Sequence, residues 1–202
     1  MLNKFVIGVS GRALAGKNTF ARFLTQKFKD QYIPVKELAF ATRLKSEMQP
    51  YLVHTYGIDI FDCTPTEKEI CRPSIIKFAK ERREATAGQH WWKLLQSDLD
   101  TALEQVIVIT DARFAFYPND EHYFIKEICH GMLIHLRKYD EVDGERVYHD
   151  KTNEEEDFND PLIKAASNIK YEWPTTSYEE ILKDNKNNLI FNTILTKYIN
   201  GQ

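Results

Sequence analysis

The sequence lacks the features of a membrane protein, of a disulfide-bonded protein and of a zinc site. No apolar run approaches the ~18 residues that a membrane-spanning helix requires. The three cysteines form no Cys-x-x-Cys pair and the six histidines form no His-Glu-x-x-His motif, so we expect reduced thiols and no zinc chemistry. Met1 leads into strand-forming residues rather than a signal segment, and we therefore expect a cytoplasmic protein.

A strong charge of either sign is also missing. The chain has 27 Lys and Arg against 30 Asp and Glu, a formal net charge of -3, which gives no electrostatic reason to expect a nucleic-acid polymer as partner. Hydrophobic residues make up 43% and charged residues 28%, as in ordinary globular proteins. The 202 residues fit one α/β domain, and we expect neither nucleic acid nor membrane as its partner.

A glycine loop near the start of the chain is the most specific motif. Residues 5–10 predict a strand, Gly11 and Gly16 bracket four residues, and Lys17 follows directly. Apolar residues then recur with helical period over 20–28. Strand, loop and helix in this order are typical of a phosphate-binding P-loop, in which backbone N–H groups and the lysine hold anionic oxygens. A chance match in a surface loop is the alternative interpretation.

We predict that this loop binds the phosphates of ATP together with Mg²⁺. The general motif continues with Ser or Thr as a metal ligand, whereas Asn18 offers a neutral and weaker amide oxygen. Asn18 and Asp111, the latter acting through a water molecule, are the predicted metal ligands. One helical step turns Thr19 by about 100° from Asn18, so Thr19 is predicted to contact phosphate. The predicted cofactor-binding residues are Gly11, Arg12, Ala13, Ala15, Gly16, Lys17, Asn18 and Thr19.

The rest of the chain alternates between strand and helix patterns. Residues 106–110 form a continuous β-branched run that predicts a central parallel strand, with Asp111 at its carboxyl end beside the glycine loop. Residues 57–67 predict a loop. The other expected elements are strands at 34–40, 132–136 and 169–171, and helices at 42–53, 73–86, 90–103, 121–128 and from Ser177 onward.

Several motifs together resemble the bacteriophage deoxynucleoside monophosphate (dNMP) kinases, a family of the P-loop NMP-kinase class. The family loop typically reads Gly-Lys-Asp-Thr, and residues 16–19 read Gly-Lys-Asn-Thr. Residues 40–45 resemble its Phe-Ala-Asp-x-Leu-Lys, with Thr42 in place of the acid. Residues 68–73 are similar to its Lys-Glu-x-x-Arg-Pro, and residues 111–114 match its Asp-x-Arg-Phe. The resemblance spans most of the chain.

Two segments depart from the family pattern. Residues 115–117 are inserted after Asp-x-Arg-Phe and displace the usual Pro-Asn-Glu to 118–121. The family's His-x-Ser-Glu is only partly echoed by 149–154, so we assign no role to His149 or Glu154.

The resemblance implies a three-layer P-loop NMP-kinase-like fold over residues 1–202, with a central, mostly parallel five-stranded sheet. It implies a substrate-binding helical region at about 42–100 and a lid at 137–160. The implied reaction moves the γ-phosphoryl group of ATP to a dNMP and yields dNDP and ADP. The viral relatives are often dimeric, so a homodimer is one of the oligomeric states that stay open. If the protein is viral, its compartment is the host cytoplasm.

Phosphoryl transfer requires cations on both phosphates and little covalent work by the protein. Planar guanidinium groups suit a phosphate acceptor, and a lid of charged residues excludes water. The predicted catalytic residues are Lys17, Arg113, Arg137 and Arg146. The predicted substrate-binding residues are Arg43, Lys45, Arg72, Asp111, Arg113 and Trp92.

Each of these assignments has a plainer alternative. Arg72 and Arg43 could be exposed charges on helices, and Arg137 and Arg146 could belong to a solvated loop. Trp92 could stack on a base or pack in the core.

Two other functions fit parts of the sequence. Animal-type phosphomevalonate kinases share the Gly-Lys-Asp loop and an Asp-x-Arg after the central strand, so another phosphorylated small molecule is an alternative acceptor. A non-catalytic nucleotide-binding switch is the second alternative, although the chain has no guanine-reading Asn-Lys-x-Asp motif.

Overall fold

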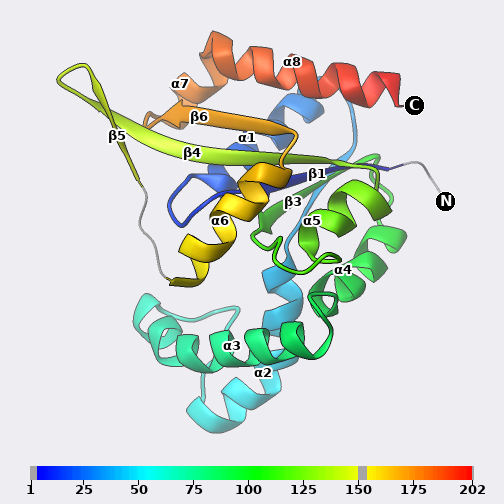
Figure 1. Cartoon of the computed structure of the whole chain (residues 1–202), viewed down its shortest axis with the longest axis vertical. Helices are drawn as coiled ribbons and strands as arrows, with labels where there is room; N and C mark the ends of the chain where they lie inside the picture. The colour runs from blue at the N-terminus through cyan, green and yellow to red at the C-terminus, as the bar shows by residue number, and fades with distance from the viewer. Residues whose placement is uncertain (1–3, 150–153, 202) are drawn as a thin grey trace.

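A mostly parallel sheet forms the middle layer of the molecule (Figure 1). The computed structural model describes residues 4–149 and 154–201, and within these residues the sheet has six strands. The five predicted strands run parallel in the order β2-β3-β1-β4-β6. Their bounds are β1 Phe5–Ser10, β2 Val35–Leu38, β3 Val106–Ala112, β4 Met132–Val142 and β6 Ile169–Pro174. The predicted α/β class with a five-stranded parallel core is therefore confirmed.

The sixth strand, β5 (Glu145–Tyr148), was not expected. β4 continues well beyond the predicted end at 136, and β5 returns antiparallel against its last residues, with Val142 opposite Glu145. Asp143 and Gly144 connect the two strands with φ values of +53° and +83°. An Asp-Gly pair is a strong hairpin signal because both turn positions need positive φ. Much of the predicted lid segment is thus a β-hairpin that extends from the sheet.

Helices cover both faces of the sheet and complete three layers (Figure 1). Alternate residues of the central strands point to opposite faces, so Ile7 and Val108 belong to one core cluster and Val6 and Ile107 to the other. The first face packs against α1 (Lys17–Asp30), α7 (Tyr178–Lys183) and α8 (Asn185–Asn200). The second face packs against α4 (His90–Thr101), the π-helical turn Phe124–Ile128 and α6 (Glu154–Ala166). A short helix, α5 (Glu121–Tyr123), precedes the π-helical turn.

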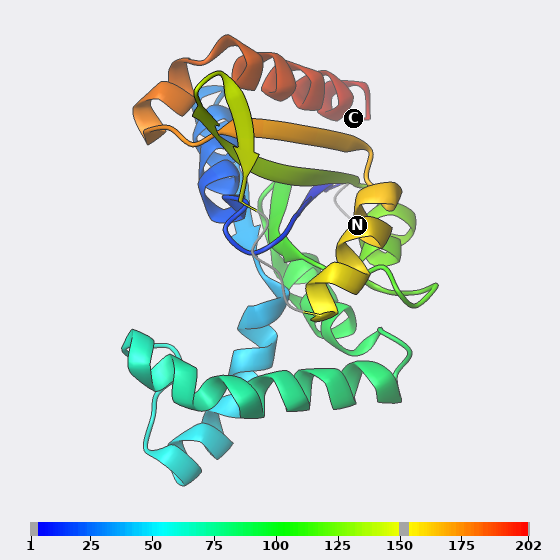
Figure 2. The same cartoon turned by 60° about the vertical axis from the view of Figure 1, so that its left-hand side comes forward.

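Two helices, α2 (Phe40–Tyr56) and α3 (Pro65–Ala85), extend away from the sheet as an arm (Figure 2). A small cluster that includes Met48, Leu52 and Cys71 holds them together. The prediction that a helix begins at Pro73 was wrong, because α3 begins at Pro65 and Pro73 lies inside it. Thr64 and Glu67 form a capping box at its start, a signal that is readable in the sequence.

The C-terminal helix expected from Ser177 is divided. Ser177 caps α7 through a capping box with Glu180, and Asp184 then caps α8 by accepting from the N–H groups of Lys186 and Asn187. Within the residues that are described, no helix combines the length and apolar character needed to cross a bilayer.

Candidate active site

The glycine loop lies between β1 and α1, as predicted, and its shape depends on two other strands. Gly11 has φ +135°, and a Cβ atom there would lie 2.4 Å from the carbonyl oxygen of Leu136 in β4. Gly16 has φ +81°, and its Cβ would lie 2.4 Å from Cζ2 of Trp173 in β6. Trp173 also donates from Nε1 to the carbonyl of Ala15 at 2.9 Å. Glycine is therefore required at both positions by conformation and by space.

Lys17 begins α1 with a buried side chain that folds back across the loop. Its ammonium donates to the carbonyl oxygens of Gly11 and Arg12, both at 2.7 Å. Burial, and then the nearby positive charge of Arg113, lower the pKa of Lys17 to about 8. The first N–H groups of a helix have no intrahelical acceptor and carry a partial positive charge, so this end of α1 is suited to an anion. Asn18 and Thr19 are exposed on that same first turn.

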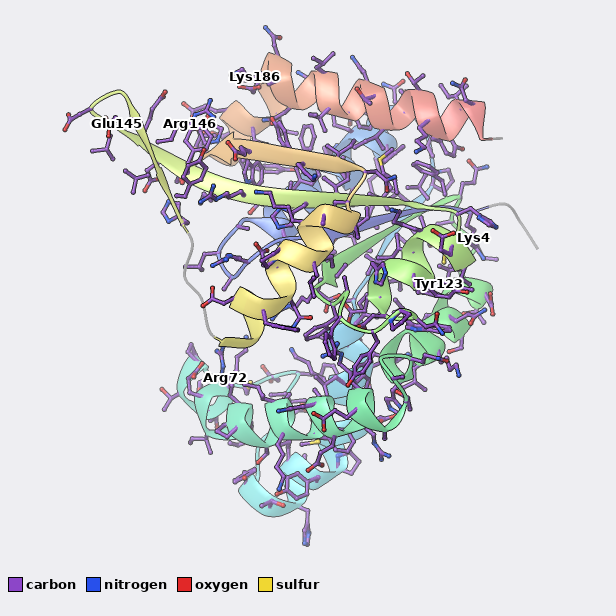
Figure 3. All side chains as sticks on the ribbon, viewed as in Figure 1. Lys4, Arg72, Tyr123, Glu145, Arg146 and Lys186 are labelled. Atoms are coloured by element: carbon purple, nitrogen blue, oxygen red, sulfur yellow. The ribbon has the colours of Figure 1, made fainter. Side chains whose placement is uncertain are left out.

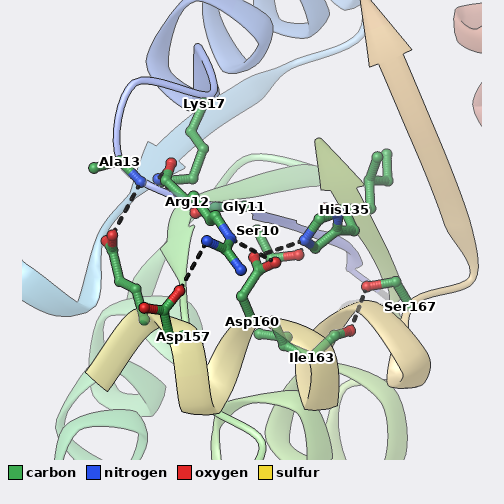
Figure 4. Close-up of polar contacts among 12 residues, drawn as sticks. Ser10, Gly11, Arg12, Ala13, Lys17, His135, Asp157, Asp160, Ile163 and Ser167 are labelled. Carbon is green, nitrogen blue, oxygen red and sulfur yellow. Dashed lines mark hydrogen bonds and ion pairs between the residues drawn. The ribbon is translucent and has the colours of Figure 1, made fainter. Parts of the chain in front are cut away.

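Acidic side chains of α6 face the loop (Figure 4). Arg12 donates to Asp157 Oδ1 at 2.9 Å and to Asp160 Oδ2 at 3.1 Å. The backbone N–H of Ala13 donates to Glu156 Oε2 at 3.4 Å. None of these acids was among the predicted site residues, because 154–160 reads in sequence only as a charged segment.

Asp160 also forms a hydrogen bond with a buried histidine of the sheet. His135 Nε2 in β4 lies 2.8 Å from Asp160 Oδ1. Burial by itself would raise the pKa of Asp160, but the hydrogen bond with His135 and the charge of Arg12 lower it below its usual value. The carboxylate is thus held in its ionised form between the loop and the sheet.

The carboxyl end of β3 lies beside the loop, as predicted for Asp111. Its two carboxylate oxygens accept from the backbone N–H groups of Phe40 and Ala41, each at 2.8 Å, so Asp111 ties the start of α2 to β3. Burial raises the pKa of Asp111, although these two N–H groups and the charge of Arg113 favour the ionised form. Asp111 therefore has a structural role, and its metal role stays a prediction.

Arg113 directly follows the last residue of β3, and its side chain is half exposed. Nη1 lies 3.8 Å from Glu156 Oε1 of α6. The backbone N–H groups of Arg113 and Phe114 donate to the buried carboxyl of Glu121 at 2.6 and 3.1 Å. Burial and the neighbouring Asp120 raise the pKa of Glu121. Glu121 thus fixes the backbone that carries Arg113.

Two cavities adjoin the loop. One of about 40 Å³ lies between the loop, the end of β3 and α6, with Gly11, Arg113 and Glu156 in its wall. A larger one of about 270 Å³ lies on the β4 side, with Ala15, Arg137 and Lys138 in its wall. The ion pair of Arg12 and Asp160 lines both cavities.

The remaining predicted substrate residues contact the arm and α4 in this structure. Arg43 donates from Nε to Asp98 Oδ2 at 2.6 Å. Lys45 lies 5.8 Å from the ring of Phe61. Arg72 pairs with Glu69 at 3.2 Å on an exposed face of α3 (Figure 3).

The structure corrects the prediction that Trp92 binds the substrate. The Trp92 ring is 7% exposed and stacks on Phe124 with centroids 5.2 Å apart, and Nε1 donates to the carbonyl of Asn119 at 2.9 Å. Trp92 therefore packs in the core, and the side chains around it cover the ring face on which a base would stack.

The two arginines predicted for the lid contact tyrosines of the hairpin. Arg137 lies 3.6 Å from the ring of Tyr148, and Arg146 lies 4.5 Å from the ring of Tyr139. Arg137 also lines the larger cavity, whereas Arg146 extends from the hairpin and lies 3.3 Å from Glu172 Oε2 (Figure 3). His149 pairs with Asp140 at 2.9 Å. Residues 150–153, which carry part of the partial His-x-Ser-Glu echo, lie outside the described residues.

No protein-family model and no curated protein sequence matches the chain. A shikimate kinase from Acinetobacter baumannii in complex with shikimate aligns with 14% identity and a TM-score of 0.43, covering 96% of this chain and 97% of that one. A shikimate kinase from Aquifex aeolicus aligns with 13% identity and a TM-score of 0.43, covering 94% and 99%. An APS kinase from Mycobacterium tuberculosis aligns with 14% identity and a TM-score of 0.37, covering 93% and 97%. Similarity this low carries no conclusion about activity, and we interpret the site from its own geometry.

Proposed function

We propose that the protein is an ATP-dependent P-loop kinase that phosphorylates a deoxynucleoside monophosphate. The observation that carries this proposal is the placement of Arg113 at the end of β3, across a small cavity from a glycine loop whose Lys17 is buried. One cationic group thus belongs to the loop and the other to the neighbouring strand. Donor and acceptor phosphates need this arrangement because phosphoryl transfer depends on alignment and charge neutralisation. The choice of a dNMP as acceptor rests on the resemblance of residues 16–19, 40–45, 68–73 and 111–114 to the phage enzymes.

The roles of the residues follow from their chemistry. The loop N–H groups and Lys17 bind the phosphates of ATP, and Arg113 binds the phosphate of the acceptor through its planar guanidinium. Arg137, in the wall of the larger cavity, and Arg146 neutralise charge on the transferring group when the lid excludes water. Arg43, Lys45 and Arg72 remain proposed acceptor contacts, in which the acceptor phosphate would replace their present partners.

The side chains near the loop fit a magnesium ion. Asn18 is exposed on the first turn of α1 and offers an oxygen ligand, and the carboxylate of Asp111 is close enough to Lys17 to influence its charge. Bound with ATP, Mg²⁺ would supply neutralisation of the β and γ phosphates. We propose Asn18 as a ligand and Asp111 as a partner that acts through water.

A coupled assay of ADP release tests the proposed function. ATP and Mg²⁺ are supplied with a panel of dNMPs, NMPs and phosphomevalonate, and Lys17→Ala serves as the inactive control. Turnover with one or more dNMPs that the variant loses supports the proposal and supplies the base specificity. Turnover with phosphomevalonate alone indicates the other kinase class. Binding of ATP without phosphorylation of any acceptor indicates a nucleotide-binding switch.

The pKa of Lys17 predicts a pH dependence of ATP binding. In the free protein this pKa is lowered to about 8, and the phosphates of bound ATP would raise it. Above pH 8 binding must therefore take up a proton, and the affinity is expected to fall by up to about tenfold per pH unit. Below pH 7 Lys17 is protonated in both states and contributes no dependence.

Calorimetric titration with ATP in two buffers of different ionisation enthalpy measures this proton uptake. We expect uptake at pH 8.5 that is absent at pH 6.5. A Lys17→Arg variant, which stays charged throughout, provides the control. Equal proton uptake by the wild type and this variant at pH 8.5 would assign the effect to another group.

A further inference from the structure

The carboxylate of Glu156 lies between the two cationic elements of the site. Oε2 accepts from the backbone N–H of Ala13 in the loop at 3.4 Å, the contact drawn as a dashed line from Ala13 in Figure 4. Oε1 lies 3.8 Å from Nη1 of Arg113 at the end of β3. A loop N–H and Arg113 are the groups that would contact the phosphoryl group during transfer. An anionic side chain of the protein itself therefore occupies this position.

The space at this position is small. The cavity bounded by the loop, Arg113 and α6 measures about 40 Å³, which is room for a few water molecules. The Glu156 carboxylate occupies part of the space between the loop and Arg113 that a phosphoryl group would need. Two anions would also repel each other at such short range. A bound phosphate and the Glu156 carboxylate in its present position therefore oppose one another.

The first turn of α6 is held by contacts that can be released. Asp157 contacts Arg12 and is about half exposed. Phe158 is 56% exposed and its ring lies 5.2 Å from that of Phe116, which belongs to the inserted residues 115–117. Deeper anchors act farther along the helix, where Asn159 and Ile163 are buried, Asp160 is bonded to the buried His135, and Lys126 donates to the carbonyl of Ala166 at 2.8 Å. The first turn of α6 can therefore move without disturbing the core.

We propose that α6 is an acidic gate, with Glu156 occupying the position of the transferring phosphoryl group until the γ-phosphate of ATP displaces it. This inference rests on the proposed function and adds a regulation of the same site. The carboxylate and the γ-phosphate compete for the N–H of Ala13. ATP binds only when the first turn of α6 moves Glu156 away, and ADP, which lacks the γ-phosphate, does not meet this competitor.

Equilibrium binding of ATP and ADP, each with Mg²⁺, tests the gate in Glu156→Gln. The amide keeps the shape of the side chain and removes its charge. We expect ATP to bind about tenfold more tightly than to the wild type, since a charge-assisted contact no longer competes with it. ADP is expected to change by less than about twofold. Glu179→Gln, an exposed acid on α7, gives the same change in net charge and should alter neither affinity.

A second variant weakens the gate without changing charge. Phe158→Ala removes the ring contact with Phe116, so it should also tighten ATP binding more than ADP binding. Unchanged or weaker ATP binding in both variants overturns the gate, and equal gains for ATP and ADP overturn the assignment of Glu156 to the γ-phosphate position. The proposed function fails separately, if the wild type binds no nucleotide or if its binding does not depend on Lys17.

Discussion

Lys17→Ala is expected to reduce phosphoryl transfer from ATP by about 10³-fold. The ammonium is the buried cation of the glycine loop, and it spans the loop by donating to the carbonyls of Gly11 and Arg12. Its removal takes away the charge that would stabilise the transferring phosphoryl group. It also leaves two loop carbonyls without their donor, which loosens the loop. Single-turnover transfer with saturating ATP and the preferred acceptor measures the loss.

Lys29→Ala provides the control for this experiment. Lys29 lies in the last turn of the same helix, α1, is exposed, and carries the same charge. Its replacement should leave transfer within about twofold of the wild type. Circular dichroism melts of both variants verify that the fold is retained. Transfer by Lys17→Ala within tenfold of the wild type would contradict the role given to Lys17.

Gly16→Ala is expected to lower the free energy of unfolding by about 3 kcal/mol and to abolish ATP binding. The added Cβ would lie 2.4 Å from Cζ2 of Trp173, whose ring is 1% exposed and tied to the loop by its hydrogen bond to Ala15. The ring cannot move aside without breaking that bond. The φ of +81° adds strain for any residue with a Cβ. Urea denaturation measures the change in stability, and calorimetry measures ATP binding.

Gly144→Ala separates the strain of a positive φ from the clash with Trp173. Gly144 has a nearly identical φ of +83° in the β4–β5 turn, but nothing lies within 4 Å of its Cβ position. Its replacement should cost only the conformational strain, about 1 kcal/mol. The difference between the two variants then measures the clash with Trp173. Equal destabilisation by both would show that the ring of Trp173 yields and that φ alone requires glycine at 16.

The core strands could be predicted because their signals are local. Residues 106–110 of β3 form an unbroken β-branched run, which is typical of a central parallel strand that helices cover on both faces. The start of α3 was also readable, since Thr64 and Glu67 have capping-box spacing, but the loop-forming residues just before them and Pro73 after them suggested a later start. β5 was missed because its exposed, charged residues show no apolar alternation, and only the Asp-Gly turn at 143–144 marks the hairpin.

The candidate site was predicted in part. The loop residues and Arg113 lie together as their motifs indicated, because each directly follows a strand of the sheet and neighbouring parallel strands end at the same edge. Trp92 was predicted to bind substrate but stacks on Phe124 in the core, because an aromatic residue looks the same in sequence at either kind of site. Arg12 was expected to face the nucleotide, and its pairing with Asp157 and Asp160 could not be anticipated.

The sequence by itself determined the glycine loop. Residues 5–19 contain the strand, both glycines, the lysine and the helix start, so their conformation follows from short-range constraints on φ and on helix N-termini. The tertiary structure alone decided what faces that loop. The contacts from α6 join residues 143 to 148 positions apart, and Trp173 reaches Ala15 across 158 positions. Such pairs depend on the packing of the whole sheet, because an acid or a tryptophan carries no local sign of its distant partner.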